Sequence, residues 1–335
     1  MIAHNDILAL TRANPGHLAP SSFTTDGGIQ VEIWDTGIFT FSPAEPGNKD
    51  IILSCGVHGN ETAPMEIVRD LAKGILDGSQ ALSHRLLILI GNPAAINLGE
   101  RQVEENLNRL FSGAHSEGEG LINDERRRAK ALEDAVARFF GQRQGAERLH
   151  YDLHTAIRGS RHEKFAVYPF LHGAPRDKEQ IRFLAACGVD TVLLSESPTT
   201  TFSYFSSHNF GAHAFTVELG KVRPFGENDM SRFEAAARTL AALVGGQDLT
   251  LPPYDESRLN LYKISRVINK QSEAFAFTFD DDVENFTPYP RGHLIATDGD
   301  IEHRIEAEEE AVIFPNAKVA LGQRATLLVV RTTLN

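Results

Sequence analysis

Cysteine is scarce in this chain, and a disulfide framework is therefore excluded. Only two cysteines occur among 335 residues, too few to staple a fold. Their surroundings, ILSCGV around Cys55 and LAACGV around Cys187, are typical of a buried strand and of a helix end. Such a low cysteine content is consistent with a protein in a reducing compartment. The first residues, MIAHNDILALTRANPG, lack the character of a signal or transit peptide, so we expect a cytoplasmic protein.

Long apolar runs and an excess of positive charge are also missing. No apolar stretch is long enough to span a bilayer, so we expect no membrane partner. Basic residues number 33 against 45 acidic ones, which gives a net charge of −12. Nucleic-acid binding needs a positive footprint, so we expect no nucleic-acid partner either. The sequence leaves the oligomeric state open.

Three common catalytic motifs are absent. The chain has no G-x-x-x-x-G-K-[ST] loop, no H-E-x-x-H helix and no G-x-S-x-G turn. Nucleotide phosphate binding, helix-borne zinc protease chemistry and serine hydrolysis therefore lose support.

What is present is an alternation of short apolar segments with amphipathic ones. The apolar segments are bounded by Gly, Pro or polar residues, as buried strands are; they cover residues 50–57, 85–93, 190–197 and 213–220. Apolar residues recur at helical spacing in residues 62–78, 125–142 and 229–246. This pattern predicts an α/β fold, with a mixed central sheet flanked by helices.

The pattern of apolar and polar residues changes near residue 250. A proline pair and a polar cluster in GGQDLTLPPYDESR are followed by short alternating runs without a convincing long helix. We expect a catalytic domain over residues 1–248 and a small β-rich C-terminal domain over residues 249–335.

The stretch SCGVHGNETAP places His58 and Glu61 where a strand turns into a helix. Open α/β sheets bind ligands beyond the carboxyl ends of their strands, and imidazole and carboxylate are both good zinc ligands. Thr62 is a plausible N-cap of the following helix. A short H-x-x-E pair also arises by chance, so a third ligand from another strand is needed.

The segment RLHYDLHTAIRGS offers that third ligand. Side chains alternate along a strand, so His150, Asp152 and His154 share one face. His154 lies at the apparent end of the strand. Asp152 can accept a hydrogen bond from a ligand imidazole and so fix the tautomer of that ring. The alternative is a half-exposed polar strand that precedes a turn.

A carboxylate inside an apolar strand is the next unusual feature. Glu218 lies between Val217 and Leu219 in HAFTVELG, where burial is costly unless the group is paired or reactive. It is suited to act as a general base and then as a proton donor. An ion pair with a neighbour such as Lys221 is the alternative.

A polar, irregular stretch, GNPAAINLGERQVEENLNRLF, supplies candidate anion clamps. It contains Arg101 and the adjacent pair Asn108 and Arg109. A planar guanidinium grips a carboxylate with two parallel hydrogen bonds, and Asn adds a further donor. Ordinary surface arginines are the alternative interpretation.

The ordered set GVHGNETAP, GNPAAINLGERQVEENLNRLF, DLHTA and FTVELG resembles the aspartoacylase and succinylglutamate desuccinylase branch of the zinc carboxypeptidase superfamily. The resemblance covers roughly the first 245 residues. Within the branch, SCGVHGNETAPMEI, NLNRLF, DLHTAIRGS and FTVELGKVRPFG are most similar to the succinylglutamate desuccinylases. It implies a zinc-carboxypeptidase-like fold and one Zn²⁺ per subunit.

The resemblance also implies a role for each matching residue. The zinc ligands would be His58, Glu61 and His154, and the catalytic acid/base would be Glu218. Arg101 would polarise the scissile carbonyl, while Asn108 and Arg109 would hold the substrate's α-carboxylate. Two departures separate the chain from aspartoacylase: FPNAKVALGQRATLL lacks a substrate-binding tyrosine, and Asn106 occupies a position that is usually acidic.

The implied reaction is hydrolysis of N-succinyl-L-glutamate, a small anionic substrate, to succinate and L-glutamate, the last step of succinyl-dependent arginine catabolism. The succinyl carboxylate needs its own cation, for which we expect Arg158, four residues beyond His154. Two alternatives stay open: an aspartoacylase-like or other N-acyl-amino-acid or peptide zinc hydrolase, and a metal- or ligand-binding module without catalysis.

Overall fold

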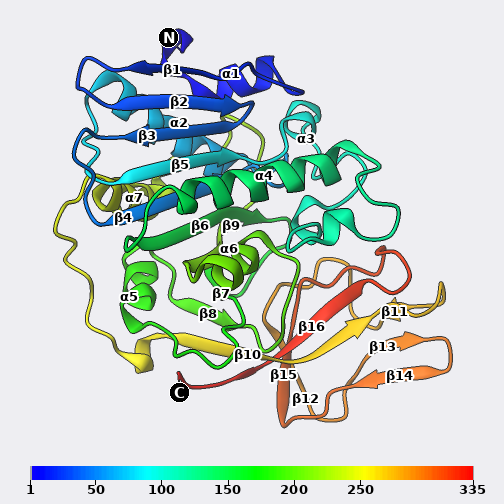
Figure 1. Cartoon of the computed structure of the whole chain (residues 1–335). Helices are drawn as coiled ribbons and strands as arrows, with labels where there is room; N and C mark the ends of the chain where they lie inside the picture. Colours follow the sequence, from blue (N-terminus) through cyan, green and yellow to red (C-terminus); the bar gives the residue numbers. More distant parts are fainter. Residues whose placement is uncertain (1, 335) are drawn as a thin grey trace.

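A mixed β-sheet organises the molecule (Figure 1). The computed structural model describes residues 2–334, and within them the sheet contains 13 strands in the order β1-β2-β3-β5-β4-β6-β9-β7-β8-β10-β16-β15-β12. Its centre is parallel, because β4 pairs in parallel with β5 and β6, and β6 pairs in parallel with β9. This confirms the predicted α/β class with a mixed central sheet.

The strands of the first part of the chain are β1 (Ser21–Thr24), β2 (Gln30–Asp35), β3 (Ile38–Ser42), β4 (Lys49–Cys55), β5 (Arg85–Ile90), β6 (Glu147–Ala156), β7 (Phe165–Tyr168), β8 (Thr191–Leu194) and β9 (His213–Lys221). The helices are α1 (Ile7–Ala13), α2 (Thr62–Asp77), α3 (Pro93–Leu98), α4 (Asp124–Gly141), α5 (Lys178–Ala186), α6 (Phe202–Phe210) and α7 (Glu234–Val244). Short 3-10 turns lie at η1 (Ala3–Asn5), η2 (Leu107–Arg109), η3 (Ala114–Ser116), η4 (Met230–Phe233) and η5 (Glu256–Arg258).

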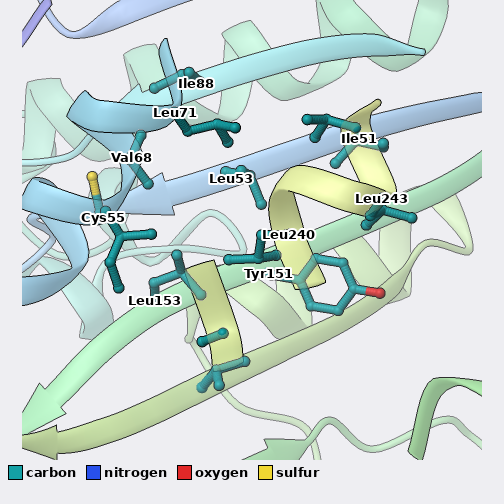
Figure 2. Close-up of a cluster of buried hydrophobic side chains, with 14 of the residues drawn as sticks. Ile51, Leu53, Cys55, Val68, Leu71, Ile88, Tyr151, Leu153, Leu240 and Leu243 are labelled. Atoms are coloured by element: carbon teal, nitrogen blue, oxygen red, sulfur yellow. The ribbon is translucent and has the colours of Figure 1, made fainter. Parts of the chain in front are cut away.

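Helices cover both faces of the central strands. Figure 2 shows side chains of β4, β5 and β6 packed against those of α2 and α7, in a cluster that includes Ile51, Leu53 and Tyr151. The opposite face carries a second apolar cluster, in which Ile52 and its neighbours meet α4 and α6. The strands are apolar on both faces because both faces are covered.

The strand β6 breaks this apolar pattern on one face. Tyr151 and Leu153 belong to the cluster under α2 and α7, whereas His150, Asp152 and His154 lie on the other face and are buried. The sequence predicted this alternation from the period of a strand. The polar face lies under α6, whose Ser206 hydroxyl lies 2.7 Å from His150 Nδ1.

The C-terminal part of the chain is β-rich, as predicted, and is built from strands β10 (Asn260–Asn269), β11 (Ala276–Phe277), β12 (Thr287–Pro290), β13 (Leu294–Asp298), β14 (Ile301–Arg304), β15 (Glu309–Ile313) and β16 (Arg324–Arg331). β10 pairs in parallel with β8, so the main sheet continues into this part, while β11, β13 and β14 form a separate sheet. The boundary at residue 248 stays a prediction. Among residues 2–334, none of the helices has the length and apolar character of a membrane span.

The turn after β4 approaches a neighbouring backbone very closely. A Cβ atom at Gly59 would lie 2.2 Å from the carbonyl carbon of Ala95 and 2.4 Å from the nitrogen of Ile96. Gly59 N–H also donates to the carbonyl of Arg101 at 3.1 Å. Only glycine fits here, and the contact fixes the turn that carries His58 and Glu61.

We predict that Gly59→Ala lowers the free energy of unfolding by about 1 to 3 kcal/mol, because the added methyl group must displace backbone atoms. Chemical denaturation of the purified variant measures this loss. Gly141→Ala is the matched control, since a Cβ there meets nothing within 4 Å. Equal stability of the two variants would contradict the predicted clash.

Candidate metal centre and active site

Three buried side chains from two segments meet beyond the strand ends. His58 and Glu61 come from the turn between β4 and α2, and His154 comes from the end of β6. Each offers one ligand atom, and these atoms all lie within 4.8 Å of one another. All three residues are buried. The structure thus brings together the side chains that the sequence proposed as metal ligands.

The carboxylate of Glu61 lies between the two imidazole rings. Its Oε1 atom is 2.8 Å from His58 Nδ1, and its Oε2 atom is 2.8 Å from His154 Nδ1. Arg101 Nη1 donates to Oε1 at 2.8 Å, and Thr155 N–H donates to Oε2 at 3.1 Å. The orientation of the carboxylate is therefore fixed from several sides.

Hydrogen bonds behind the rings fix which nitrogen of each imidazole faces Glu61. The Oδ1 atom of Asn106 accepts the N–H of Asn108 at 3.0 Å, so it also accepts from His58 Nε2, 3.0 Å away. On the other ring, His154 Nε2 donates to Asp152 Oδ2 at 2.8 Å. Both Nδ1 atoms are left to face the carboxylate.

This donor set fits a divalent cation. Burial, followed by the charge of Arg101, lowers the pKa of His58 to about 4, so its Nδ1 lone pair points at a carboxylate oxygen. Burial opposes charge on His154, but Asp152 and Glu61 raise its pKa well above the usual value, which places a proton beside Glu61. Two imidazole nitrogens and a carboxylate that converge in this way could hold a metal ion, and they are the ligand types of catalytic zinc sites.

The start of α2 differs from the prediction. Thr62 was expected as the N-cap, but α2 begins at Thr62 and its N-cap is Glu61, without a side-chain cap hydrogen bond. The Thr62 hydroxyl instead donates to the carbonyl of Arg223 at 2.7 Å. The carboxylate of Glu61 is occupied by the imidazoles, so neither side chain is available to cap the helix.

Glu218 lies next to this centre. On β9 it is the register partner of His154 on β6, and it is buried. Its Oε2 atom has no hydrogen-bond partner among the described residues, and the ion pair with Lys221 is not formed there. Burial, followed by the charge of Glu61, raises the pKa of Glu218 to about 7, against the opposing charges of His154 and Arg101.

Arg101, Asn108 and Arg109 lie on the segment that borders the centre. Arg101 reaches Glu61 directly. The Oδ1 atom of Asn108 accepts the N–H of Phe202 at 3.0 Å, which leaves its NH₂ group as a donor. Burial, followed by the charges of Arg324 and Arg101, lowers the pKa of Arg109 well below its usual value. These cations therefore act on one another.

Arg158, expected to bind the succinyl carboxylate, donates from Nη1 to the backbone carbonyls of Asp281 and Val283. It therefore ties the segment after β6 to the C-terminal part of the chain. Its predicted role in substrate binding stays a prediction.

Sequence reasoning missed Arg324, which begins β16. Burial, followed by the charge of Arg101, lowers its pKa to about 10. Within residues 2–334 its guanidinium forms no hydrogen bond or ion pair, and lies 5.7 Å from the ring centroid of Phe314. A local pattern does not reveal it, because it reaches the other arginines through the tertiary fold. Asn106 distinguishes the sequence from aspartoacylase, and its contact with His58 joins segments far apart in the chain.

Family models match both parts of the chain. The succinylglutamate desuccinylase/aspartoacylase catalytic domain matches residues 47–244, and the AstE/AspA barrel-sandwich hybrid domain matches residues 257–332.

Individual proteins of this kind match over nearly the whole length. A curated succinylglutamate desuccinylase of Shewanella pealeana is 54% identical over 325 residues, which cover 96% of this chain and 94% of the relative. A crystal structure of that enzyme from Vibrio parahaemolyticus has a TM-score of 0.88 at 38% identity, covering 98% of this chain and 95% of the other. The one from Chromobacterium violaceum has a TM-score of 0.87 at 40% identity, covering 98% of each.

We predict that His58→Ala lowers the zinc content of the purified protein well below one equivalent, because it removes one of three ligand side chains. Elemental analysis after dialysis against trace zinc measures the stoichiometry. His17→Ala is the control, since that imidazole is exposed and pairs with Asp35. Full zinc stoichiometry in His58→Ala would remove His58 from the ligand set.

Proposed function

Because the chain belongs to the succinylglutamate desuccinylase/aspartoacylase family, we propose that it is a zinc-dependent amide hydrolase that converts N-succinyl-L-glutamate and water to succinate and L-glutamate. The observation that carries the proposal is the buried His58, Glu61 and His154 group with Glu218 beside it. A place in the cytoplasm, at the end of succinyl-dependent arginine catabolism, belongs to the same proposal.

His58, Glu61 and His154 would hold the zinc ion. When bound, zinc would supply Lewis acidity and would make a water molecule acidic enough to attack near neutral pH. The remaining steps belong to the side chains around it.

Glu218 would move the proton. Its carboxylate accepts a proton from the attacking water while the water oxygen bonds to the amide carbon, and it then delivers that proton to the leaving nitrogen as the C–N bond breaks. A pKa raised to about 7 suits both roles, because general acid–base catalysis works best with a pKa near the operating pH. Its Oε2 atom, without a hydrogen-bond partner among the described residues, is available for this transfer.

Arg101 would stabilise the oxygen of the scissile carbonyl. Negative charge grows on that oxygen only on the way to the tetrahedral state, so a donor aimed there lowers the barrier. Asn108 and Arg109 would hold the α-carboxylate of the glutamate portion by an amide donor and a guanidinium. Arg109 needs such a partner, since burial and two neighbouring cations disfavour its charge.

The succinyl carboxylate of the substrate needs a cation of its own. Arg158 donates to two backbone carbonyls, whereas the guanidinium of Arg324 forms no hydrogen bond or ion pair within residues 2–334 and interacts electrostatically with Arg109 and Arg101. We therefore propose Arg324 as the residue that binds the succinyl carboxylate, ahead of Arg158.

Two other functions compete with this proposal. An aspartoacylase-like or other N-acyl-amino-acid hydrolase would use the same centre with a different pocket. A metal- or ligand-binding module would use it without catalysis, and would have no need of Glu218. Initial rates with N-succinylglutamate, N-acetylglutamate and N-acetylaspartate separate the three. Faster turnover of N-acetylaspartate would displace the proposed substrate, and no turnover of any would favour the binding module.

We predict that Glu218→Gln lowers kcat by about 100- to 10,000-fold, because the amide cannot accept the proton of the attacking water. Zinc content and the thermal unfolding midpoint should stay close to the wild-type values. Glu310→Gln is the matched control, since Glu310 is another buried strand carboxylate, paired with Arg266. Wild-type turnover in Glu218→Gln would exclude Glu218 as the acid/base.

We predict that Arg324→Gln lowers kcat/KM for N-succinylglutamate by about 10- to 100-fold, the cost of one charged hydrogen-bonded contact. The kcat/KM for N-acetylglutamate, which lacks the acyl carboxylate, should change little. Arg158→Gln is the parallel variant and should affect both substrates alike. If Arg158→Gln lost the preference for the succinyl substrate and Arg324→Gln kept it, binding of the succinyl carboxylate would be assigned to Arg158 instead.

A further inference from the structure

A chain of polar side chains crosses the covered face of the sheet behind the candidate metal centre. Ser54 on β4, His150 and Asp152 on β6 and Ser206 on α6 are each 0% exposed. Their neighbours on this face are apolar residues of the cluster that packs against α4 and α6. Buried polar groups are costly unless each one is hydrogen-bonded. We therefore asked which hydrogen bonds these four side chains form and what the bonds hold in place.

The contacts form a continuous series. Ser206 Oγ lies 2.7 Å from His150 Nδ1, and His150 Nε2 lies 2.8 Å from Ser54 Oγ. Ser54 Oγ lies 2.5 Å from Asp152 Oδ1. The other oxygen of Asp152 then accepts from His154. The series therefore ends on a ring that faces Glu61.

Proton counting gives every bond a direction. Asp152 Oδ2 lies 2.8 Å from His154 Nε2, and an ionised carboxylate has no proton to donate, so both oxygens of Asp152 accept. Ser54 must donate its single proton to Asp152, and its oxygen must then accept from His150 Nε2. A neutral imidazole has one N–H, so His150 Nδ1 accepts from the Ser206 hydroxyl.

Ser54 is the side-chain donor on Oδ1 of Asp152, and removing its hydroxyl would leave a buried carboxylate oxygen without this hydrogen bond. A carboxylate held at both oxygens keeps one orientation, and it then keeps its partner imidazole in one tautomer. Outer partners of this kind change metal affinity by about 10- to 100-fold in other proteins. The strand register supports the arrangement, because Ser54 is the register partner of Asp152.

We propose that Ser54 and His150 are positioning residues of the metal centre, which hold Asp152 and through it orient His154 for metal binding. The proposal extends the proposed function at the same site. It concerns zinc affinity, which is measured separately from turnover.

The test compares two buried serine hydroxyls, that of Ser54 on β4 and that of Ser203 on α6. We expect Ser54→Ala to weaken zinc binding by about 10- to 100-fold, measured by competition with a chromophoric chelator. Ser203→Ala is the matched control: Ser203 is buried, and its hydroxyl lies 2.8 Å from Thr216 Oγ1, outside the series. Its zinc affinity should equal that of the wild type, although chemical unfolding of the metal-free proteins should show a loss of stability in both variants.

A double variant separates positioning from general destabilisation. In the Asp152→Asn background, Ser54→Ala should cause less than a further threefold loss of zinc affinity, because the carboxylate that Ser54 positions is already gone. Fully multiplicative losses would show that Ser54 acts independently of Asp152 and would overturn the proposal.

A second position tests the same series if Ser54→Ala fails to fold. His150→Gln keeps an N–H donor for Ser54 and should retain more zinc affinity than His150→Leu, which keeps none. Equal affinities in these two variants, or wild-type affinity in Ser54→Ala, would overturn the inference. If the wild type binds zinc and the variants show the expected losses of affinity, but the wild type does not hydrolyse N-succinylglutamate, the proposed function is overturned and the positioning role is supported.

Discussion

The site depends on one electrostatic constraint, the convergence of two imidazole nitrogens on a buried carboxylate. Glu61 has an imidazole Nδ1 atom 2.8 Å from each of its oxygens, and each ring is held from behind by Asn106 or Asp152. The lone pair of His58 Nδ1 and the negative carboxylate of Glu61 face one another in a dry site, where they repel unless a cation lies between them. The arrangement is costly without a metal ion and favourable with one, so binding of the ion should also stabilise the fold.

The sheet makes this convergence possible. Parallel pairing of β4, β6 and β9 aligns their carboxyl ends, which brings the turn after β4, the His154 ring and Glu218 to the same edge. Gly59 then lets the turn lie against the backbone of Ala95 and Ile96. The helices on both faces exclude water, which raises the pKa of Glu218 and makes each remaining charge more effective.

Much of this follows from the sequence because its signals are local. Alternation along β6 predicts that His150, Asp152 and His154 share a face, and the strand-to-helix turn predicts where His58 and Glu61 lie. The prediction that Thr62 caps α2 was wrong, because the Thr62 hydroxyl donates to the carbonyl of Arg223, which lies far away in the sequence. The contacts of Asn106, Ser54 and Arg324 could not be predicted, since they join segments far apart in the chain.

In the proposed function, the C-terminal part of the chain contributes to substrate choice as well as to packing. It continues the main sheet through β10 and places Arg324 where its charge acts on Arg109 and Arg101. Like charges that lie close together in a partly buried site raise the energy of the ligand-free protein, and a polyanionic substrate relieves that repulsion on binding. A substrate with one carboxylate relieves less of it than a substrate with several. If the proposed function holds, this local difference favours a small ligand with several carboxylates over a singly charged acylamino acid, against the net charge of −12 of the whole chain.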